Sequence, residues 1–314
     1  MASTPLGPIL ASMRIRLFDV PMDFGANLRG VDMGPTALRR AGLKEALICL
    51  GHTVEEEPRL LRVAIAEHAQ PGDPKVRFLD IIAQGCRRLA EHVEQACTDG
   101  AFPLVLGGDH SIAVGTLAGL GAFHSKKKHS WGTLWIDAHA DFNTPETSPS
   151  GNVHGMSLAA SCGWGHPALT ELYRKDRKLD PANAVVLGVR DLDPGEKENL
   201  KKAGVKVLTM ADIDREGIAA VADQALGYLA DRVDEIHVSF DVDSLDPETA
   251  PGVGTPVPGG MTFRELHLLM ETLSASGRVT SAEVVEVNPV LDVRNQTARV
   301  AVAMIESLLG ATIL

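Results

Sequence analysis

The chain has 314 residues, 45% of them hydrophobic, which is enough to bury a sizeable core in one large α/β domain or two small ones. Its formal net charge of −11 at pH 7 argues against nucleic acid and anionic membranes as partners. No segment approaches the roughly 18 consecutive apolar residues of a membrane span.

The ends of the chain bear on its location and domain organisation. Residues 1–12 lack the basic start of a secretory signal, and we expect a disordered leader followed by one domain over residues 13–314. The four cysteines show no Cys-x-x-Cys spacing, which is typical of free thiols in a reducing cytosol. We therefore expect a cytoplasmic protein.

Strand-like and helix-like segments alternate along the chain. The expected strands are 14–21, 53–57, 102–107, 132–137, 183–189, 205–209, 235–240 and 280–287. The expected helices begin near 34 or cover 76–98, 111–122, 194–203, 216–230, 263–275 and 295–309. This alternation indicates βαβ units and a mainly parallel sheet, with no linker that would divide domains.

The first segment of chemical interest follows the strand at 102–107. Gly107 and Gly108 permit a tight turn, and His110 then lies at the strand end, where a helix begins. A single histidine in such a place is more often structural than a ligand.

A second segment, at 134–141, is an apolar strand that ends in Asp-x-His-x-Asp. If the backbone stays extended, Asp137, His139 and Asp141 point to one face, and the crowded carboxylates favour a cation between them. A solvated polar strand is the alternative, but the preceding apolar run looks buried on both faces. The mixed oxygen and nitrogen donors suit Mn²⁺, Fe²⁺, Co²⁺ or Zn²⁺ better than Ca²⁺ or Mg²⁺.

The strand at 235–240 also ends in carboxylates, Asp241 and Asp243, before a turn at Asp246. In parallel sheets, the carboxyl ends of the strands are where ligands bind. The three clusters supply four Asp and two His, too many for one four-coordinate metal with an open site. They suit two metals roughly 3.5–4 Å apart that share carboxylates and activate a water.

Charge indicates the class of substrate. The four aspartates balance two divalent ions, and no Lys or Arg occurs in the three metal segments. A phosphoryl substrate normally requires surplus positive charge, so we expect a cationic substrate instead. Long connections after Asp141 and Asp243 are expected to line the mouth of this site and set its specificity.

With these motifs assembled, the chain resembles the ureohydrolase superfamily and, within it, the arginase family. The motifs are Gly-Gly-Asp-His at 107–110, Asp-Ala-His-Ala-Asp at 137–141 and Ser-Phe-Asp-Val-Asp-x-Leu-Asp-Pro at 239–247. The resemblance implies a three-layer α/β/α fold with about eight strands and two Mn²⁺ per subunit. It also implies a homotrimer or homohexamer.

The resemblance assigns a role to each ligand by position. One metal would be held by His110, Asp137, Asp141 and Asp241, and the other by His139, Asp137, Asp241 and Asp243, with Asp137 and Asp241 bridging.

The loop after Asp141 resembles the part of the family that binds L-arginine. Asn143, Ser150 and Asn152 correspond to residues that recognise the α-carboxylate, and short polar side chains are suited to this. Asp193 and Glu196 are placed to meet the α-ammonium, although acids in a first helical turn also stabilise the helix.

The resemblance further implies hydrolysis of L-arginine to L-ornithine and urea. Glu286 would contact the guanidinium, with Glu283 a weaker candidate, and Thr255 would line the site. Asp141 would handle the proton of the attacking water, and His154 would shuttle it.

Two alternatives stay open. Agmatinase, guanidinobutyrase and other ureohydrolases act on guanidines without the full amino-acid head group, so the 150–155 loop would have less to bind. A non-catalytic relative that acts as a binding module is disfavoured because all six ligands are present.

Overall fold

Buried apolar runs form the strands of one parallel sheet in the computed structural model, which describes residues 12–57 and 70–312. The eight strands found in these residues are β1 (Arg14–Val20), β2 (Thr53–Glu56), β3 (Phe102–Gly107), β4 (Trp131–Ile136), β5 (Ala184–Val189), β6 (Lys206–Thr209), β7 (Glu235–Asp241) and β8 (Val279–Val285). Their order is β2-β1-β3-β8-β7-β4-β5-β6, and all neighbouring pairs are parallel.

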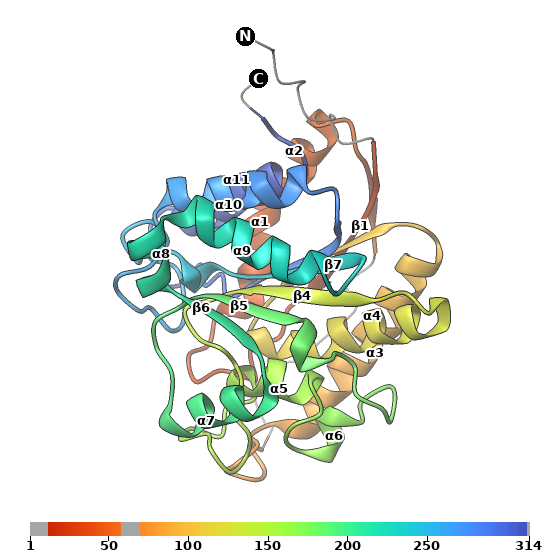
Figure 1. The fold of residues 1–314 in the computed structure, drawn as a ribbon, viewed down its shortest axis with the longest axis vertical. Helices are drawn as coiled ribbons and strands as arrows, with labels where there is room; N and C mark the ends of the chain where they lie inside the picture. The colour runs from red at the N-terminus through yellow and green to blue at the C-terminus, as the bar shows by residue number, and fades with distance from the viewer. Residues whose placement is uncertain (1–11, 58–69, 313–314) are drawn as a thin grey trace.

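Helices cover both faces of this sheet, because successive strand residues enter two different cores (Figure 1). In β4, Leu134 and Ile136 pack on one side, and Trp135 packs on the other. The first core also contains α1 (Gly34–Arg40), α2 (Leu43–Cys49), α8 (Met210–Glu216), α9 (Ile218–Ala230), α10 (Phe263–Ala275) and α11 (Gln296–Leu308). The second contains α3 (Leu79–Thr98), α4 (Ala113–Lys127), α5 (Ser157–Ser161), α6 (Pro167–Thr170) and α7 (Pro194–Ala203). The predicted three-layer α/β/α class is confirmed.

Several helices differ from expectation. The predicted helix 216–230 corresponds to α9, which begins at Ile218. A separate helix, α8, ends just before it, because Gly217 adopts a φ of 81° that interrupts the helical backbone. The predicted helix 111–122 begins as a 3-10 turn at His110–Ile112 and continues as α4 to Lys127. The helices α2, α5 and α6 were not predicted.

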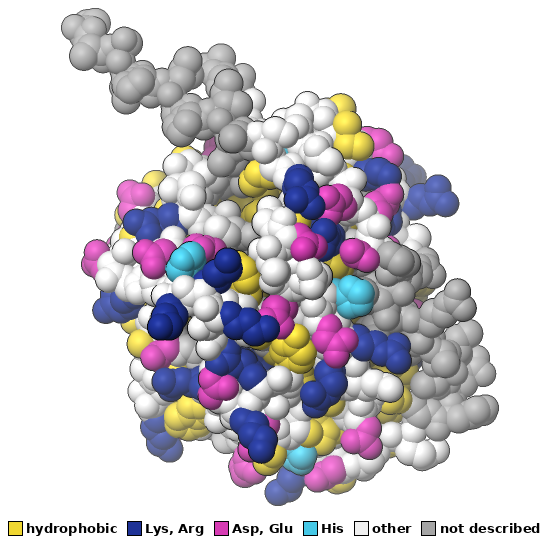
Figure 2. Space-filling model, turned by 90° about the vertical axis from the view of Figure 1, so that its right-hand side faces the viewer, with side chains coloured by type: hydrophobic (Ala, Val, Ile, Leu, Met, Phe, Trp, Pro, Cys, Tyr) yellow, Lys and Arg dark blue, Asp and Glu magenta, His cyan; other side chains and the backbone are white. Residues whose placement is uncertain are grey.

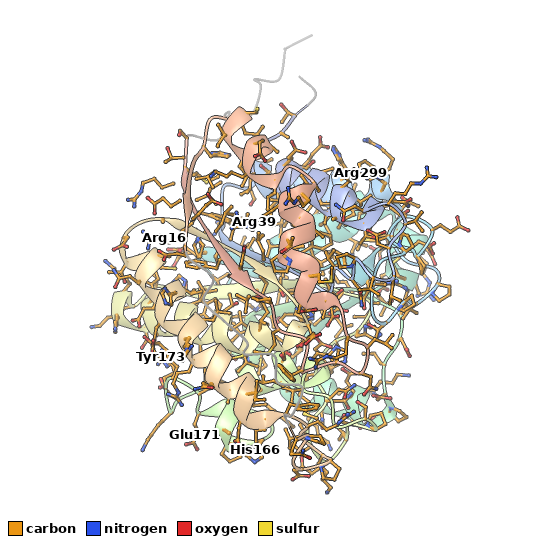
Figure 3. The ribbon with its side chains drawn as sticks, turned by 180° about the vertical axis from the view of Figure 1, so that it is seen from behind. Arg16, Arg39, His166, Glu171, Tyr173 and Arg299 are labelled. Atoms are coloured by element: carbon orange, nitrogen blue, oxygen red, sulfur yellow. The ribbon has the colours of Figure 1, made fainter. Side chains whose placement is uncertain are left out.

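Ion pairs fix the edge of the sheet at β2, which is less buried than the central strands. Arg16 of β1 pairs with Glu55 of β2 at 2.8 Å and with Asp99 at 2.9 Å, while Arg39 of α1 pairs with Asp19 of β1 at 2.9 Å. Figure 3 labels the two arginines. In the strand order, β3, β8, β7 and β4 lie in the middle of the sheet, and the candidate site is at their carboxyl ends.

The surface is mixed in charge. Basic and acidic side chains are interspersed over the face shown in Figure 2. Within residues 12–57 and 70–312, no helix combines the length and apolarity required to cross a membrane. The predicted leader, apart from Ser12, lies outside the described residues.

Candidate active site

Four neighbouring strands bring the candidate residues together. Because β3, β8, β7 and β4 are adjacent and parallel, their carboxyl ends meet at one edge of the sheet. The residues at these ends are His110 after β3, Glu286 after β8, Asp241 and Asp243 at β7, and Asp137, His139 and Asp141 after β4.

Five of the six predicted ligands form two groups that share Asp137, and the sixth, Asp141, lies beside His110 of the first group. His110 Nδ1 lies 3.1 Å from Asp137 Oδ2, 3.0 Å from Asp141 Oδ2 and 3.2 Å from Asp241 Oδ2. His139 Nδ1 lies 3.4 Å from Asp137 Oδ1 and 3.2 Å from Asp243 Oδ2. Asp137 thus faces the two histidines through different oxygens, which is the arrangement expected of a carboxylate between two metal ions.

The surroundings of His110 show that these donors fit a divalent metal. Its Nδ1 and Asp141 Oδ2 are buried without a hydrogen-bond partner among the described residues. On the other side of the ring, Nε2 lies 2.8 Å from Ser239 Oγ, which donates to Glu283 Oε1 at 2.7 Å. Since Ser239 uses its hydrogen on Glu283, it accepts from Nε2, which leaves the Nδ1 lone pair for a metal. Glu283 therefore orients the predicted ligand His110 through Ser239.

The pKa values of the aspartates indicate the same requirement for positive charge. Burial and the neighbouring Asp243 and Asp137 raise the pKa of Asp241 well above its ordinary value. Burial and Asp137 raise the pKa of Asp141 to about 6. Burial also acts to raise the pKa of Asp137, but the two neighbouring histidines leave it below its ordinary value. Four ionised carboxylates at this density are stable only around cations.

The local backbone differs from the extended conformation that was expected. The strand β4 ends at Ile136, His139 N donates to Asp137 Oδ1 at 2.7 Å, and Asp141 adopts a left-handed φ of 51°. Asp243 likewise lies in a 3-10 turn, where its N–H donates to Asp241 Oδ1 at 2.8 Å. The side chains converge as predicted, but the extended backbone was wrong: the chain turns, and each first aspartate binds the turn that follows.

Glu286 is held by the Gly-Gly turn. Its N–H donates to Gly108 O at 2.8 Å, and a Cβ on Gly108 would lie 1.7 Å from Met22 O, so only glycine fits there. Strand β8 ends at Val285, one residue before Glu286, which has a left-handed φ of 65°. This turn directs Glu286 Oε1 to His110 N at 2.9 Å and to His154 Nδ1 at 3.1 Å.

His154 joins the metal region to the pocket. Burial lowers its pKa, but the hydrogen bond and charge of Glu286 outweigh burial and raise the pKa to about 9. His154 therefore carries a proton at neutral pH in this arrangement, next to a buried carboxylate.

A pocket of about 130 Å³ opens above the ligands and is lined by most of the predicted site residues. These are His139, Asp141, Asn143, Ser150, Asn152, His154, Asp193, Glu196, Asp241 and Thr255. His110, Asp137, Asp243 and Glu286 are not part of the lining. Ser148, Pro149, Gly155, Asp191 and Leu192 also line it and were not predicted as site residues, although the first three belong to the loop expected at its mouth.

The start of α7 forms the acidic end of this pocket. Asn143 Nδ2 donates to Asp193 Oδ2 at 2.9 Å, and Glu196 accepts from Phe142 N at 2.8 Å and Asp193 N at 3.2 Å. Burial raises the pKa of Glu196 to about 7, against the effect of these two backbone hydrogen bonds. The two acids thus stabilise the helix start and also face the pocket, so both expected roles are compatible. Thr255 Oγ1 donates to Asp243 Oδ2 at 2.9 Å.

Comparison with known proteins decides the family. The model of the arginase family matches residues 13–310. The chain belongs to the arginase family. It is 50% identical to the arginase of Bacillus caldovelox over 94% of this chain and 98% of that protein.

Solved members of the arginase family share the fold. The Bacillus caldovelox arginase structure has a TM-score of 0.91 at 49% identity and covers 96% of this chain and 100% of its own. An Entamoeba histolytica arginase in complex with L-ornithine has a TM-score of 0.87 at 30% identity, covering 97% of this chain and 100% of its own.

One residue of this arginase-family site had no signal in the sequence. The guanidinium of Arg190, just after β5, donates to five backbone carbonyls, those of Gly188, Asp243, Ser244, Leu245 and Val257. It thereby joins the turn that carries Asp243 to the loop that carries Thr255. Backbone carbonyls belong to every residue type, so no sequence pattern reveals such a contact.

Proposed function

We propose that this protein hydrolyses L-arginine to L-ornithine and urea, using two Mn²⁺ ions per subunit. The observation that carries the proposal is the pair of His/Asp groups that share Asp137 at the base of an acidic pocket. We call the six predicted ligands and Glu286 the floor of the pocket. Membership of the arginase family supports it.

The ligand sets proposed for the two ions are those that the resemblance to the family implies. His110, Asp137, Asp141 and Asp241 would hold one ion, and His139, Asp137, Asp241 and Asp243 would hold the other. Mixed carboxylate and imidazole donors suit Mn²⁺. When bound, the ions would lower the pKa of a water so that a nucleophile is available near neutral pH.

The chain's own residues orient the substrate and move protons. Glu286 Oε2 is buried and has no hydrogen-bond partner among the described residues, which leaves one oxygen to accept from the guanidinium. Asp141 would take the proton of the attacking water. His154 lines the pocket and would deliver a proton to the leaving amine of ornithine.

The polar residues around the mouth of the pocket, which we call its rim, would bind the amino-acid head group. Asp193 and Glu196 would face the α-ammonium, while Ser150 and Asn152 would donate to the α-carboxylate. Asn143 Nδ2 already donates to Asp193 and retains a second hydrogen for the carboxylate. This division assigns the acidic end of the pocket to the cation of the head group.

A urea-release assay tests the proposal directly. The metal-loaded protein is expected to have a kcat/KM for L-arginine at least a hundredfold above that for agmatine, which lacks only the carboxylate. A preference for agmatine or another guanidine would contradict L-arginine as the substrate and indicate an agmatinase, a guanidinobutyrase or another ureohydrolase. A metal-replete protein that hydrolyses no guanidine would indicate a binding module.

The proposal includes a homotrimer or homohexamer in the cytoplasm and a catalytic domain over residues 13–314. Sedimentation equilibrium of the metal-loaded protein would give the subunit number, and a monomer would contradict this part alone. Cell fractionation would test the location.

A further inference from the structure

Asn152, on the rim of the pocket, accepts a hydrogen bond from the cationic side chain of Arg77. Arg77 Nη1 donates to Asn152 Oδ1 at 3.3 Å and to Asn27 Oδ1 at 2.7 Å. The backbone N–H of Arg77 also donates to Gly151 O at 2.9 Å. Arg77 is not among the residues that line the pocket. It therefore lies behind the rim and contacts it through both side chain and backbone.

The two segments are packed too closely to slide past one another. Gly151 adopts a left-handed φ of 71°, and a Cβ there would lie 1.9 Å from Pro74 O. Only glycine fits at this approach, so the 150–152 loop rests directly on the backbone at 74–77. The register between Arg77 and Asn152 is thereby fixed.

The chemistry of the two side chains sets the orientation of the amide. A guanidinium only donates hydrogen bonds, so Arg77 can hold Asn152 Oδ1 but not Nδ2. Asn152 is 6% exposed, lines the pocket, and makes no Nδ2 hydrogen bond among the described residues. The donor end of the amide is thus the end left for a ligand.

The charge of the pocket makes this contact consequential. Its described lining contains His139 and His154 but no Lys or Arg, and it contains Asp141, Asp191, Asp193, Glu196 and Asp241. The residues proposed to bind the carboxylate, Asn143, Ser150 and Asn152, are neutral, and several acidic side chains share the pocket with them. A cation bonded to Asn152 polarises the amide, strengthens its donation and offsets part of the repulsion.

We propose that Arg77 is a positioning residue for the α-carboxylate of the substrate: it fixes the Asn152 amide with Nδ2 towards the pocket and supplies positive charge one amide away. The inference rests on the proposed function, because it takes Asn152 as a carboxylate donor. It adds a determinant of specificity that acts without touching the substrate.

The test compares substrates that differ in one group. Arg77→Met is expected to raise KM for L-arginine about five- to tenfold, as for loss of a charge-assisted hydrogen bond, with kcat within about twofold. The inhibition constant of agmatine, which keeps the ammonium but lacks the carboxylate, is expected to stay within about twofold. Arg77→Lys keeps the charge and should recover part of the loss.

Matched variants separate positioning from general damage. Lys75→Met removes an exposed cation two residues away and is expected to behave as the unchanged protein. If Arg77→Met weakens agmatine and L-arginine equally, or lowers kcat as strongly as it raises KM, the positioning role is overturned.

Asn152→Ala distinguishes failure of this inference from failure of the proposed function. If Asn152→Ala leaves KM for L-arginine unchanged, the proposed carboxylate contact is wrong. If it raises KM while Arg77→Met does not, only the positioning role is wrong. The inference expects the double variant to be no worse than Asn152→Ala alone, because both changes remove one interaction.

Discussion

The floor of the pocket and its rim serve one substrate in the proposed reaction, but they are held by different kinds of structure. The floor consists of charged side chains at adjacent strand ends, supported by the buried Ser239 and Glu283 and by the half-buried Arg190. The rim consists mainly of short polar side chains on the 142–155 loop, supported by α7 and Arg77. Damage to the floor should therefore remove the chemistry, whereas damage to the rim should change affinity and selectivity.

The largest effect is expected from Asp137→Ala. Asp137 faces both histidines, so its loss should weaken both metal groups and lower kcat on the order of a thousandfold or more. Metal analysis of the purified variant should find fewer than two ions per subunit. A variant that keeps two ions and normal kcat would contradict the shared role of Asp137.

His154→Asn tests the border between floor and rim. His154 contacts Glu286 and not the six ligands in the pairs described above, so both ions should remain. The loss of a proton donor should lower kcat about a hundredfold. Unchanged kcat would refute the shuttle role. Loss of metal would show that His154 helps to hold the metal ions.

Ser239→Ala tests the support behind the floor. Without Ser239 Oγ, His110 Nε2 loses its acceptor and the ring loses its fixed tautomer, so metal affinity should fall about 10- to 100-fold. Chelator competition measures this affinity, and excess Mn²⁺ should restore most of kcat.

Ser281→Ala is the matched control for that variant. Ser281 is also a buried serine, on β8, but it bonds His237 Nδ1 at 2.9 Å instead of a predicted ligand. Equal loss of metal affinity in both variants would show that general disturbance of the sheet, rather than the support of His110, is responsible.

The floor could be predicted from the sequence because its signal is local. A buried run followed by Asp or His marks a strand end, and parallel strands bring such ends together without further information. The conformations were not predictable in the same way. Asp141 and Glu286 adopt left-handed φ values, and these depend on contacts with distant backbone, such as Gly108 O for Glu286.

Two supports of the site, Arg77 at the rim and Arg190 at the floor, left no pattern in the sequence. Arg77 and Asn152 are 75 residues apart, and Arg190 and Val257 are 67 apart. In the second case the acceptor is a backbone carbonyl, which carries no residue signature, and in the first it is an ordinary loop amide. Such contacts emerge only when the fold places the two segments together.

The smallest expected effect concerns the pH dependence of the rim. Burial raises the pKa of Glu196 to about 7, so the carboxyl is largely protonated below that pH and ionised above it. Only the ionised form attracts the α-ammonium, so the inhibition constant of L-ornithine should fall about threefold between roughly pH 6 and 8, at saturating Mn²⁺. Glu196→Gln should bind L-ornithine more weakly at the upper end and remove this step. Inhibition by 5-guanidinopentanoate, which keeps the carboxylate but lacks the ammonium, should show no such step. If it shows the same step, the titrating group acts on the floor, and the division between floor and rim fails at Glu196.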